Sequence, residues 1–352
     1  MRKTLFLVMT DQIEGVFIPF VKAALWILSQ IYWFLLALRR LFYRIGILKR
    51  HGLSLPVISV GNLTLGGVGK TPLIEYLVRI LKENGFRPVV LTRGYMAKKA
   101  GHQAQGSDEA AMVEAKWHVP VLAGADRFKN AKKFMEKIPV DVFLLDDGFQ
   151  HWRLGRDLDI VAIDATNPWG NGHLLPRGIL REPKKALSRA DIFVLTKIDL
   201  GNERLEDIRK DLAAINPKAP IVEAIHKPVL FSDLRSNDEL DLASIQGERI
   251  CTVCGVGSPN SFIKTLVELE ADIDEHFAFL DHHVYSAADI QTMIHQCQKK
   301  GIAVLVTTEK DAVKLGAFLN LFPDSIRVLS LKIEIVIVSG EGEFLERINH
   351  LL

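Results

Sequence analysis

The chain has few cysteines, little net charge and no repeated or low-complexity segment. The only cysteines in 352 residues are Cys251, Cys254 and Cys297, a number that argues against a disulfide framework and favours a reducing compartment. Cys251 and Cys254 have the spacing of half a metal site, but no second pair completes it, so we expect them to be buried in a strand. The net charge of +2 predicts no nucleic-acid partner.

What the sequence does contain is a glycine-rich turn after an apolar strand. Residues 56–72 read P-V-I-S-V-G-N-L-T-L-G-G-V-G-K-T-P. Glycines adopt positive φ and carry no Cβ, so backbone N–H groups can converge on a polyphosphate. Lys70 is predicted to reach the β- and γ-phosphates and Thr71 to offer its hydroxyl to Mg²⁺, at the start of a helix.

This turn predicts a nucleotide-binding P-loop. The residues assigned to it are Thr64, Leu65, Gly66, Gly67, Val68, Gly69, Lys70 and Thr71. The general pattern G-x-x-x-x-G-K-[ST] has a glycine where this chain has Thr64, so we interpret the loop as a variant.

A second motif, residues 142–151, follows the pattern of a Walker B strand. Four apolar residues precede Asp146 and Asp147, whose carboxylates are predicted metal ligands opposite Thr71. Adjacent residues of a strand point to opposite faces, so both acids can act only if the strand already turns at Asp147. Gly148 favours such a turn.

The N-terminal segment differs from the rest of the chain. Residues 16–38 are apolar apart from Lys22, Ser29 and Gln30, and five Arg and Lys residues follow between positions 39 and 50. Such a stretch is long enough to cross a bilayer core of about 30 Å or to lie in its interface. The basic cluster places the following domain on the cytoplasmic side. The alternative is a core helix of a soluble domain.

Buried apolar runs alternate with amphipathic stretches in the remainder of the chain. Strands are expected at residues 57–60, 88–92, 140–145, 158–163, 192–196, 250–254, 303–307 and 326–331. This βαβα order predicts an α/β fold with a parallel sheet covered by helices on both faces. The predicted domains are an anchor at residues 1–48, a P-loop kinase-like domain at 49–226 and a smaller C-terminal α/β domain at 227–352.

Two segments resemble the [NT]-K-x-D element with which GTPases bind guanine. They are Thr196-Lys197-Ile198-Asp199 and Thr307-Thr308-Glu309-Lys310-Asp311. At most one can hold a single base, and the sequence leaves open which one does. Together with the P-loop, the first segment supports the alternative of a membrane-associated GTPase. A non-catalytic membrane module is the other alternative, which Lys70, Thr71 and the two aspartates argue against.

The order of several short motifs resembles the tetraacyldisaccharide 4'-kinases of lipid A biosynthesis, from about Arg39 to near the end of the chain. Thr64 is ordinary for that family. The motifs that carry the resemblance are Thr64-Leu65-Gly66-Gly67-Val68-Gly69-Lys70-Thr71-Pro72, Arg93-Gly94-Tyr95, Asp126-Arg127, Asp146-Asp147-Gly148-Phe149-Gln150-His151, Arg156-Asp157-Leu158-Asp159, Leu174-Leu175-Pro176, Leu180-Arg181-Glu182-Pro183 and Asp281-His282-His283.

The resemblance implies transfer of the γ-phosphate of ATP, with Mg²⁺, to the 4'-hydroxyl of a tetraacyldisaccharide 1-phosphate, which gives lipid IVA. It also implies work at the cytoplasmic face of a bacterial inner membrane, with the bilayer and its lipid as partners. We expect no obligate protein partner. An anchored enzyme can reach a bilayer lipid without extracting its acyl chains, which costs about 0.8 kcal/mol per CH₂.

The resemblance further implies roles for individual residues. Asp108 is expected to be the catalytic base, paired with His282, while Lys70 stabilises the transferred phosphate; Glu182 is expected to assist the metal. The segment Gly106-Ser107-Asp108-Glu109 departs from the family pattern at Ser107 and Ala110, and Asp108 could instead cap a helix and His282 pack in a core. Expected contacts of the disaccharide and its 1-phosphate, each of which could instead be structural, are Arg93, Tyr95, Arg127, Gln150, His151 and Arg181.

Overall fold

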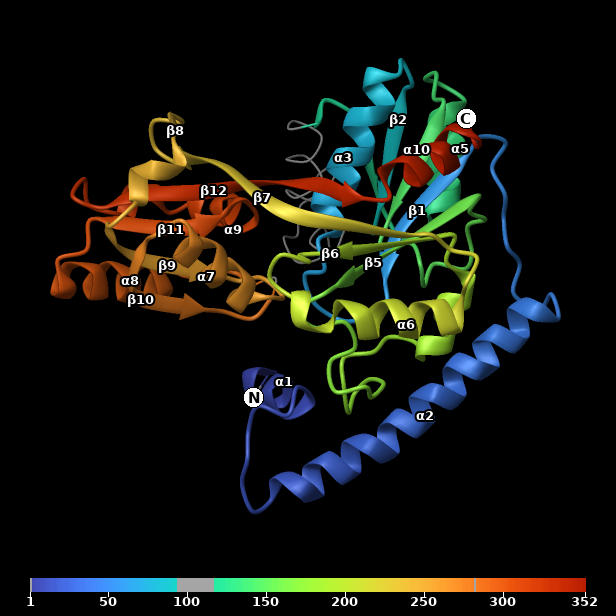
Figure 1. Cartoon of the computed structure of the whole chain (residues 1–352), viewed down its shortest axis with the longest axis horizontal. Helices are drawn as coiled ribbons and strands as arrows, with labels where there is room; N and C mark the ends of the chain where they lie inside the picture. Colours follow the sequence, from blue (N-terminus) through green and yellow to red (C-terminus); the bar gives the residue numbers. More distant parts are fainter. Residues whose placement is uncertain (1, 94–116, 282) are drawn as a thin grey trace. The chain divides into compact units, whose positions relative to one another are not determined.

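A parallel sheet forms the centre of the N-terminal part of the protein. The structure is a computed structural model, and it describes residues 2–93, 117–281 and 283–352. The chain divides into two compact units, one made of Met1–Ile225 with Ile337–Leu352 and the other of His226–Val336. The first unit contains, in spatial order, β6 (Ile192–Thr196), β5 (Leu158–Asp164), β1 (Val57–Asn62), β4 (Val142–Asp146), β2 (Pro88–Thr92) and β3 (Val121–Ala123). All neighbours in this order are parallel, as predicted (Figure 1).

These strands form because runs of β-branched and leucine residues are buried on both faces of the sheet. Val57, Phe143 and Leu145 belong to one apolar cluster, whereas Val161 and Phe193 belong to another. The first unit also contains α3 (Lys70–Glu83), α5 (Arg127–Met135), η1 (Lys184–Arg189), η2 (Asn202–Arg204), α6 (Leu205–Ile215) and α10 (Glu341–Asn349). The α/β class is therefore confirmed.

The N-terminal segment forms two helices, α1 (Arg2–Met9) and α2 (Ile18–Arg44). Helix α2 is long and apolar enough to cross a membrane, and only 11% of its most apolar window is buried. Hydrogen bonds join α2 to the rest of the first unit: the Ser29 hydroxyl donates to the Leu174 carbonyl at 2.9 Å, and the Tyr32 hydroxyl donates to the Arg181 carbonyl at 2.9 Å. A mostly exposed helix does not fit the alternative of a core helix.

The second unit is a smaller α/β layer. The strands β10 (Asp272–Ala278), β9 (Arg249–Cys254), β11 (Val304–Thr308) and β12 (Arg327–Ser339) are parallel neighbours. The other elements are β8 (Glu239–Leu240), η3 (Leu242–Ile245), α7 (Pro259–Glu268), α8 (Ala287–Lys300), α9 (Glu309–Gly316) and η4 (Leu319–Leu321). Residues of β9 alternate between two apolar clusters, with Cys251 in one and Cys254 in the other. Both are fully buried thiols in a strand, as predicted.

Two long strands connect the units. The chain enters the second unit along β7 (Ile221–Asp233) and returns along β12. The last helix, α10, belongs to the first unit, where the Tyr76 hydroxyl of α3 donates to Glu341 at 2.7 Å. The three-domain division made from the sequence stays a prediction, and it did not foresee this return of residues 337–352.

Candidate functional site

The predicted P-loop lies between the carboxyl end of β1 and the first turn of α3. Gly66 and Gly69 have φ values of 118° and 85°, which residues with a Cβ rarely adopt. On the preceding side, Leu65 N–H donates to the Ile179 carbonyl at 2.7 Å, and Thr64 forms a bridge with Leu180. The segment around Leu180 therefore flanks the P-loop. This position explains why the Leu180-Arg181-Glu182-Pro183 motif accompanies the P-loop motif in the sequence.

Lys70 links the P-loop to the carboxyl ends of two strands, β1 and β4. Its Nζ donates to Asn62 Oδ1 at 2.8 Å and lies 3.1 Å from Asp147 Oδ1. Asn62 is the last residue of β1, and Asp147 follows the last residue of β4. The lysine that should bind phosphate is thus close to the predicted metal ligands.

The two acidic residues at the end of β4, Asp146 and Asp147, have different environments. The strand ends at Asp146, and Asp147 has a φ of 51°, so the chain turns where the sequence required it to. Burial raises the pKa of Asp146, although the charge of Lys70 opposes this. Burial also disfavours ionisation of Asp147, but Lys70 and Arg181 outweigh it and lower its pKa to about 2.

Close packing and hydrogen bonds fix the turn at residues 147–151. A Cβ on Gly61 would lie 2.5 Å from Phe149 Cβ, so the turn rests directly against β1. Arg156 Nη1 donates to the carbonyl of Gly148 at 3.1 Å and to that of His151 at 3.0 Å. Arg156, from the Arg156-Asp157-Leu158-Asp159 motif, therefore holds this turn.

Arg189, which the sequence analysis did not select, contacts the same turn. Its guanidinium forms two hydrogen bonds with Glu182, at 2.9 and 3.0 Å, and donates to the Phe149 carbonyl at 3.3 Å. It also lies over the rings of Phe149 and Trp152, at 4.3 and 4.6 Å from their centroids. Both oxygens of Glu182 are used by Arg189, and the predicted metal role of Glu182 stays a prediction. No motif marks Arg189, so only the fold identifies it.

Gln150 and His151 lie in a strongly cationic environment. Gln150 Nε2 donates to the Asn62 carbonyl at 2.8 Å, and the Gln150 carbonyl accepts from Arg39 of α2 at 3.3 Å. Burial and then the neighbouring charges of Arg127, Arg156, Arg39 and Arg153 lower the pKa of His151 to about 4. His151 is therefore neutral at pH 7, and an anion bound here would meet several positive charges.

The other predicted substrate contacts occupy varied positions. Arg181 Nη1 donates to both oxygens of Asp147, at 2.7 and 2.8 Å, and to Gln150 Oε1 at 3.4 Å. Arg127 is 3% exposed and donates to the Asp146 carbonyl at 2.9 Å, so it supports the end of β4. Arg93 is exposed just after β2. Tyr95, Asp108 and His282 lie outside the described residues.

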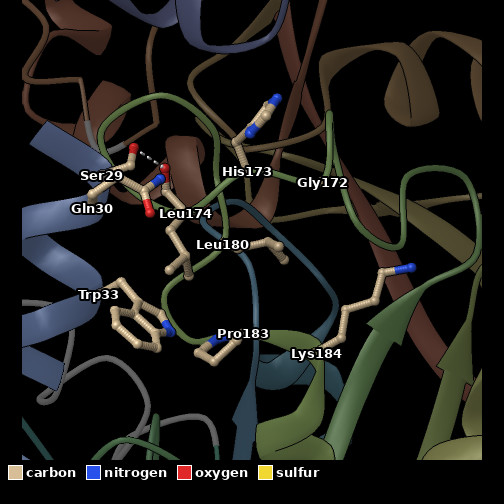
Figure 2. A pocket seen from close by; sticks show the side chains of 9 residues that line it. All are labelled: Ser29, Gln30, Trp33, Gly172, His173, Leu174, Leu180, Pro183 and Lys184. Atoms are coloured by element: carbon tan, nitrogen blue, oxygen red, sulfur yellow. Dashed lines mark hydrogen bonds between the residues drawn. The ribbon is translucent and has the colours of Figure 1, made fainter. Parts of the chain in front are cut away.

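A pocket of about 380 Å³ opens between α2 and the loop that precedes η1. Figure 2 shows Ser29, Gln30 and Trp33 on α2 facing Leu174, Leu180 and Pro183 of the loop, with the Ser29 hydrogen bond to Leu174 dashed. His173 and Lys184 add polar groups to its lining. The pocket is mostly apolar. Two of its lining residues, Leu180 and Pro183, flank Arg181 and Glu182 in the sequence.

The Asp281-His282-His283 segment of the second unit is held on both sides of His282. Asp281 pairs with Lys310 at 3.0 Å, and His283 Nε2 lies 3.2 Å from Asp289 Oδ2. The ring of His283 stacks on Phe279 with centroids 4.2 Å apart. These contacts fix the two residues that flank the predicted catalytic histidine.

Comparisons with known proteins agree on one family. The family model described as tetraacyldisaccharide-1-P 4'-kinase, LpxK, matches residues 21–352. A tetraacyldisaccharide 4'-kinase from Halothermothrix orenii is 38% identical over 316 residues, which cover 82% of this chain and 82% of that protein. One from Syntrophus aciditrophicus is 38% identical over 322 residues, or 80% and 84% of the two chains. The crystal structure of LpxK from Aquifex aeolicus in complex with ATP superposes with a TM-score of 0.70 at 29% identity, covering 94% of this chain and 99% of that one.

Proposed function

The chain belongs to the tetraacyldisaccharide-1-P 4'-kinase family, and from that premise we propose that it phosphorylates the 4'-hydroxyl of a tetraacyldisaccharide 1-phosphate with ATP, at the cytoplasmic face of an inner membrane. The kinase assignment follows from the family. The identity of the nucleotide, the metal, the acceptor contacts and the membrane face are the proposal.

One observation carries it: a single turn joins the two halves of the site. Asp147 at the start of the turn contacts Lys70 of the P-loop at 3.1 Å. Gln150 and His151 at its end lie among arginines, including Arg39 of α2. A nucleotide phosphate on the P-loop and an anionic acceptor beside α2 would therefore be neighbours.

The residues around Asp146 fit a magnesium ion. Mg²⁺ prefers oxygen ligands and is usually bound through one or two carboxylates together with substrate phosphates. Burial disfavours the charge of the Asp146 carboxylate, a cost that a bound cation would offset, and its register partner Val60 lies on the strand that leads to the P-loop. Asp146, Asp147 and Thr71 would hold the ion, which neutralises charge on the β- and γ-phosphates when bound.

The chemistry assigned to the protein is electrostatic and positional. The acceptor oxygen forms a bond to the γ-phosphorus while the bond to the bridging oxygen of ADP breaks, and the hydroxyl proton passes to a base. Lys70 and the backbone amides of the P-loop stabilise the charge on the transferred phosphate. Asp108, with His282, is the proposed base.

The surroundings of α2 suit a lipid acceptor. The pocket beside Trp33 and Leu180 is mostly apolar and could receive part of an acyl chain. Arg39 and Arg181 both contact Gln150 in the turn at residues 147–151, and their guanidinium groups could bind the sugar phosphate bidentately. The acceptor would then be recognised without leaving the membrane interface.

The proposal is tested by supplying ATP or GTP, each labelled at the γ-phosphate, with and without tetraacyldisaccharide 1-phosphate. We expect label in the lipid with ATP, dependent on the acceptor and on Mg²⁺. Guanine-specific binding with hydrolysis that needs no acceptor would instead establish the GTPase alternative. Nucleotide binding without transfer or hydrolysis would support a non-catalytic module.

The proposed base has its own test. Asp108→Ala and His282→Ala should each lower kcat strongly while ATP affinity stays close to normal. Residues that act on one proton transfer are non-additive, so the double variant should be little worse than the poorer single variant. Fully multiplicative losses, or a defect confined to ATP binding, would place the base elsewhere, with Asp147 the next candidate.

A further inference from the structure

The segment at residues 196–199, which resembles a guanine-binding element, contacts the P-loop instead. Lys197 has a φ of 56° and is 4% exposed. Its Nζ donates to the Gly67 carbonyl at 2.9 Å. The neighbouring Thr196, which is fully buried, donates its hydroxyl to the Val68 carbonyl at 2.8 Å. Two adjacent residues at the end of β6 thus bind two adjacent carbonyls inside the loop.

A buried acidic residue, Asp164, lies beside Lys197. The carboxylate of Asp164, at the end of β5, pairs directly with Lys197 Nζ. Its other oxygen accepts from the backbone N–H of Thr166 at 3.0 Å and from the Thr166 hydroxyl. An ion pair with satisfied hydrogen bonds tolerates burial, whereas either charge alone would be costly.

These carbonyl contacts determine where the P-loop amides point. A trans peptide unit is planar, and its C=O and N–H point in opposite directions. Holding the Gly67 carbonyl toward Lys197 therefore directs the N–H of Val68 the other way, and holding the Val68 carbonyl toward Thr196 does the same for Gly69. A phosphate-binding loop needs its N–H groups to converge before the anion arrives.

We propose that Lys197, supported by Asp164 and assisted by Thr196, is a positioning residue that holds the P-loop amides in their phosphate-binding orientation. It sets affinity for the polyphosphate and does not contact the base. This inference rests on the proposed nucleotide site but not on the identity of the acceptor.

The other segment that resembles a guanine-binding element, residues 307–311, makes different structural contacts. Thr308 caps α9, accepting from Asp311 N–H at 3.2 Å, and Lys310 pairs with Asp281. In the segment at residues 196–199, Asp199 is exposed, whereas Thr196 and Lys197 donate hydrogen bonds to carbonyls of the P-loop. Both segments therefore have structural partners that explain their lysine and threonine.

The experiment compares Thr196→Val, Lys197→Met and the double variant Lys197→Met/Asp164→Asn, in the full chain. Arg209→Met is the matched control. It removes a cation of α6, in the same unit, that is also paired with a carboxylate, that of Glu223. For each protein, the affinities for ATP, ADP and GTP are measured by calorimetry, together with KM for ATP and for the lipid acceptor. Thermal unfolding identifies variants that fail to fold.

Loss of one neutral hydrogen bond is expected to change an equilibrium constant about fivefold, and loss of a hydrogen bond from a charged donor about tenfold or more. We therefore expect KM for ATP and the dissociation constants of ATP and ADP to rise about fivefold in Thr196→Val and at least about tenfold in Lys197→Met. The ratio of ATP to GTP affinity and KM for the lipid should not change. The Asp164→Asn substitution should restore stability lost in Lys197→Met without restoring nucleotide affinity.

Several outcomes would overturn the inference. Normal ATP and ADP affinity in folded Thr196→Val and Lys197→Met proteins would show that the contacts do not position the loop. An altered ATP to GTP ratio would show that the segment contacts the base. Equal losses in Arg209→Met would reveal general destabilisation. If the wild-type chain bound ATP but transferred no phosphate, the proposed function would fail while the calorimetric test remained decisive.

Discussion

The ammonium group of Lys70 lies 3.1 Å from Oδ1 of Asp147, so the turn after β4 supplies a carboxylate partner to the lysine of the P-loop. Arg181 binds the same carboxylate at 2.7 Å. Although burial opposes ionisation of Asp147, these two cations keep its pKa low, and it is charged at neutral pH. The relationship makes the P-loop and the turn at residues 147–151 one electrostatic unit.

Replacing Lys70 should therefore impair catalysis more than folding. We expect Lys70→Ala to lower kcat/KM for phosphoryl transfer at least about a hundredfold, since one charge-stabilising donor is lost. Asp147 keeps Arg181, so the turn should persist. Arg79→Ala, which removes an exposed cation from the same helix, is the control. Near-normal transfer by a folded Lys70→Ala protein would rule out the P-loop assignment.

The exposed face of α2 should govern membrane association. Ile27, Ile31 and Phe34 are 57%, 52% and 59% exposed and share one helical face. Replacing all three by serine should reduce sedimentation with phospholipid vesicles and raise KM for a lipid acceptor in vesicles, while kcat on detergent-dispersed acceptor is retained. The vesicle assay with purified protein checks this expectation.

The matched control replaces three apolar residues of similar exposure elsewhere, Ile138, Val267 and Val284, by serine. This control should sediment like the wild-type protein. If the α2 variant also sediments normally, a different surface holds the membrane.

The strands were predictable from the sequence because buried parallel strands are continuous apolar runs. Residues 88–92 and 192–196 form β2 and β6 with the predicted bounds. In contrast, β12 continues to Ser339 although only residues 326–331 were predicted, because its second half alternates between buried and exposed positions. Local pattern also cannot show that the segment after Val336 returns to the first unit, since that depends on long-range contacts.

The site was partly predictable for a similar reason. Lys70 and Asp147 belong to motifs whose chemistry fixes residue type and spacing, and the structure brings them together. Arg189 and Arg39 belong to no such motif, because an arginine that holds a carbonyl or a ring needs only the right position in space. Lys197 matched a motif but forms different contacts from those the motif suggests.

Protonation of His151 should destabilise the fold in mild acid. Among the described residues its Nε2 is buried without a hydrogen-bond partner, and burial and nearby arginines lower the pKa to about 4. The unfolded chain takes up this proton near pH 6.5, so between about pH 6.5 and 4 the unfolded state binds more protons and stability falls as pH falls. Measured Tm should therefore drop less between pH 7 and 5 in His151→Gln than in the wild-type protein.

His295→Gln, which changes an exposed histidine of α8, is the control for this measurement. It should show the same drop in Tm as the wild-type protein. An equal drop in His151→Gln would mean that His151 is not held neutral in the folded state.

The contact between Glu182 and Arg189 leads to the last prediction, which separates a structural role from the metal role expected for Glu182. Glu182 is 3% exposed, and both of its oxygens accept from Arg189, which also donates to the Phe149 carbonyl. Arg189→Gln and Glu182→Gln should each lower the free energy of unfolding by about 2 kcal/mol, a value between those of exposed and fully buried ion pairs.

Because the two residues form one pair, the double variant should be less destabilised than the sum of the single variants. If Glu182 acts only through Arg189, both single variants should lower kcat by a similar factor and leave the Mg²⁺ concentration for half-maximal activity unchanged. Titration of activity with Mg²⁺ at saturating ATP, with Asp146→Asn as the positive control for a metal ligand, checks this. A shift in the Mg²⁺ dependence of Glu182→Gln that Arg189→Gln does not share would assign Glu182 to the metal.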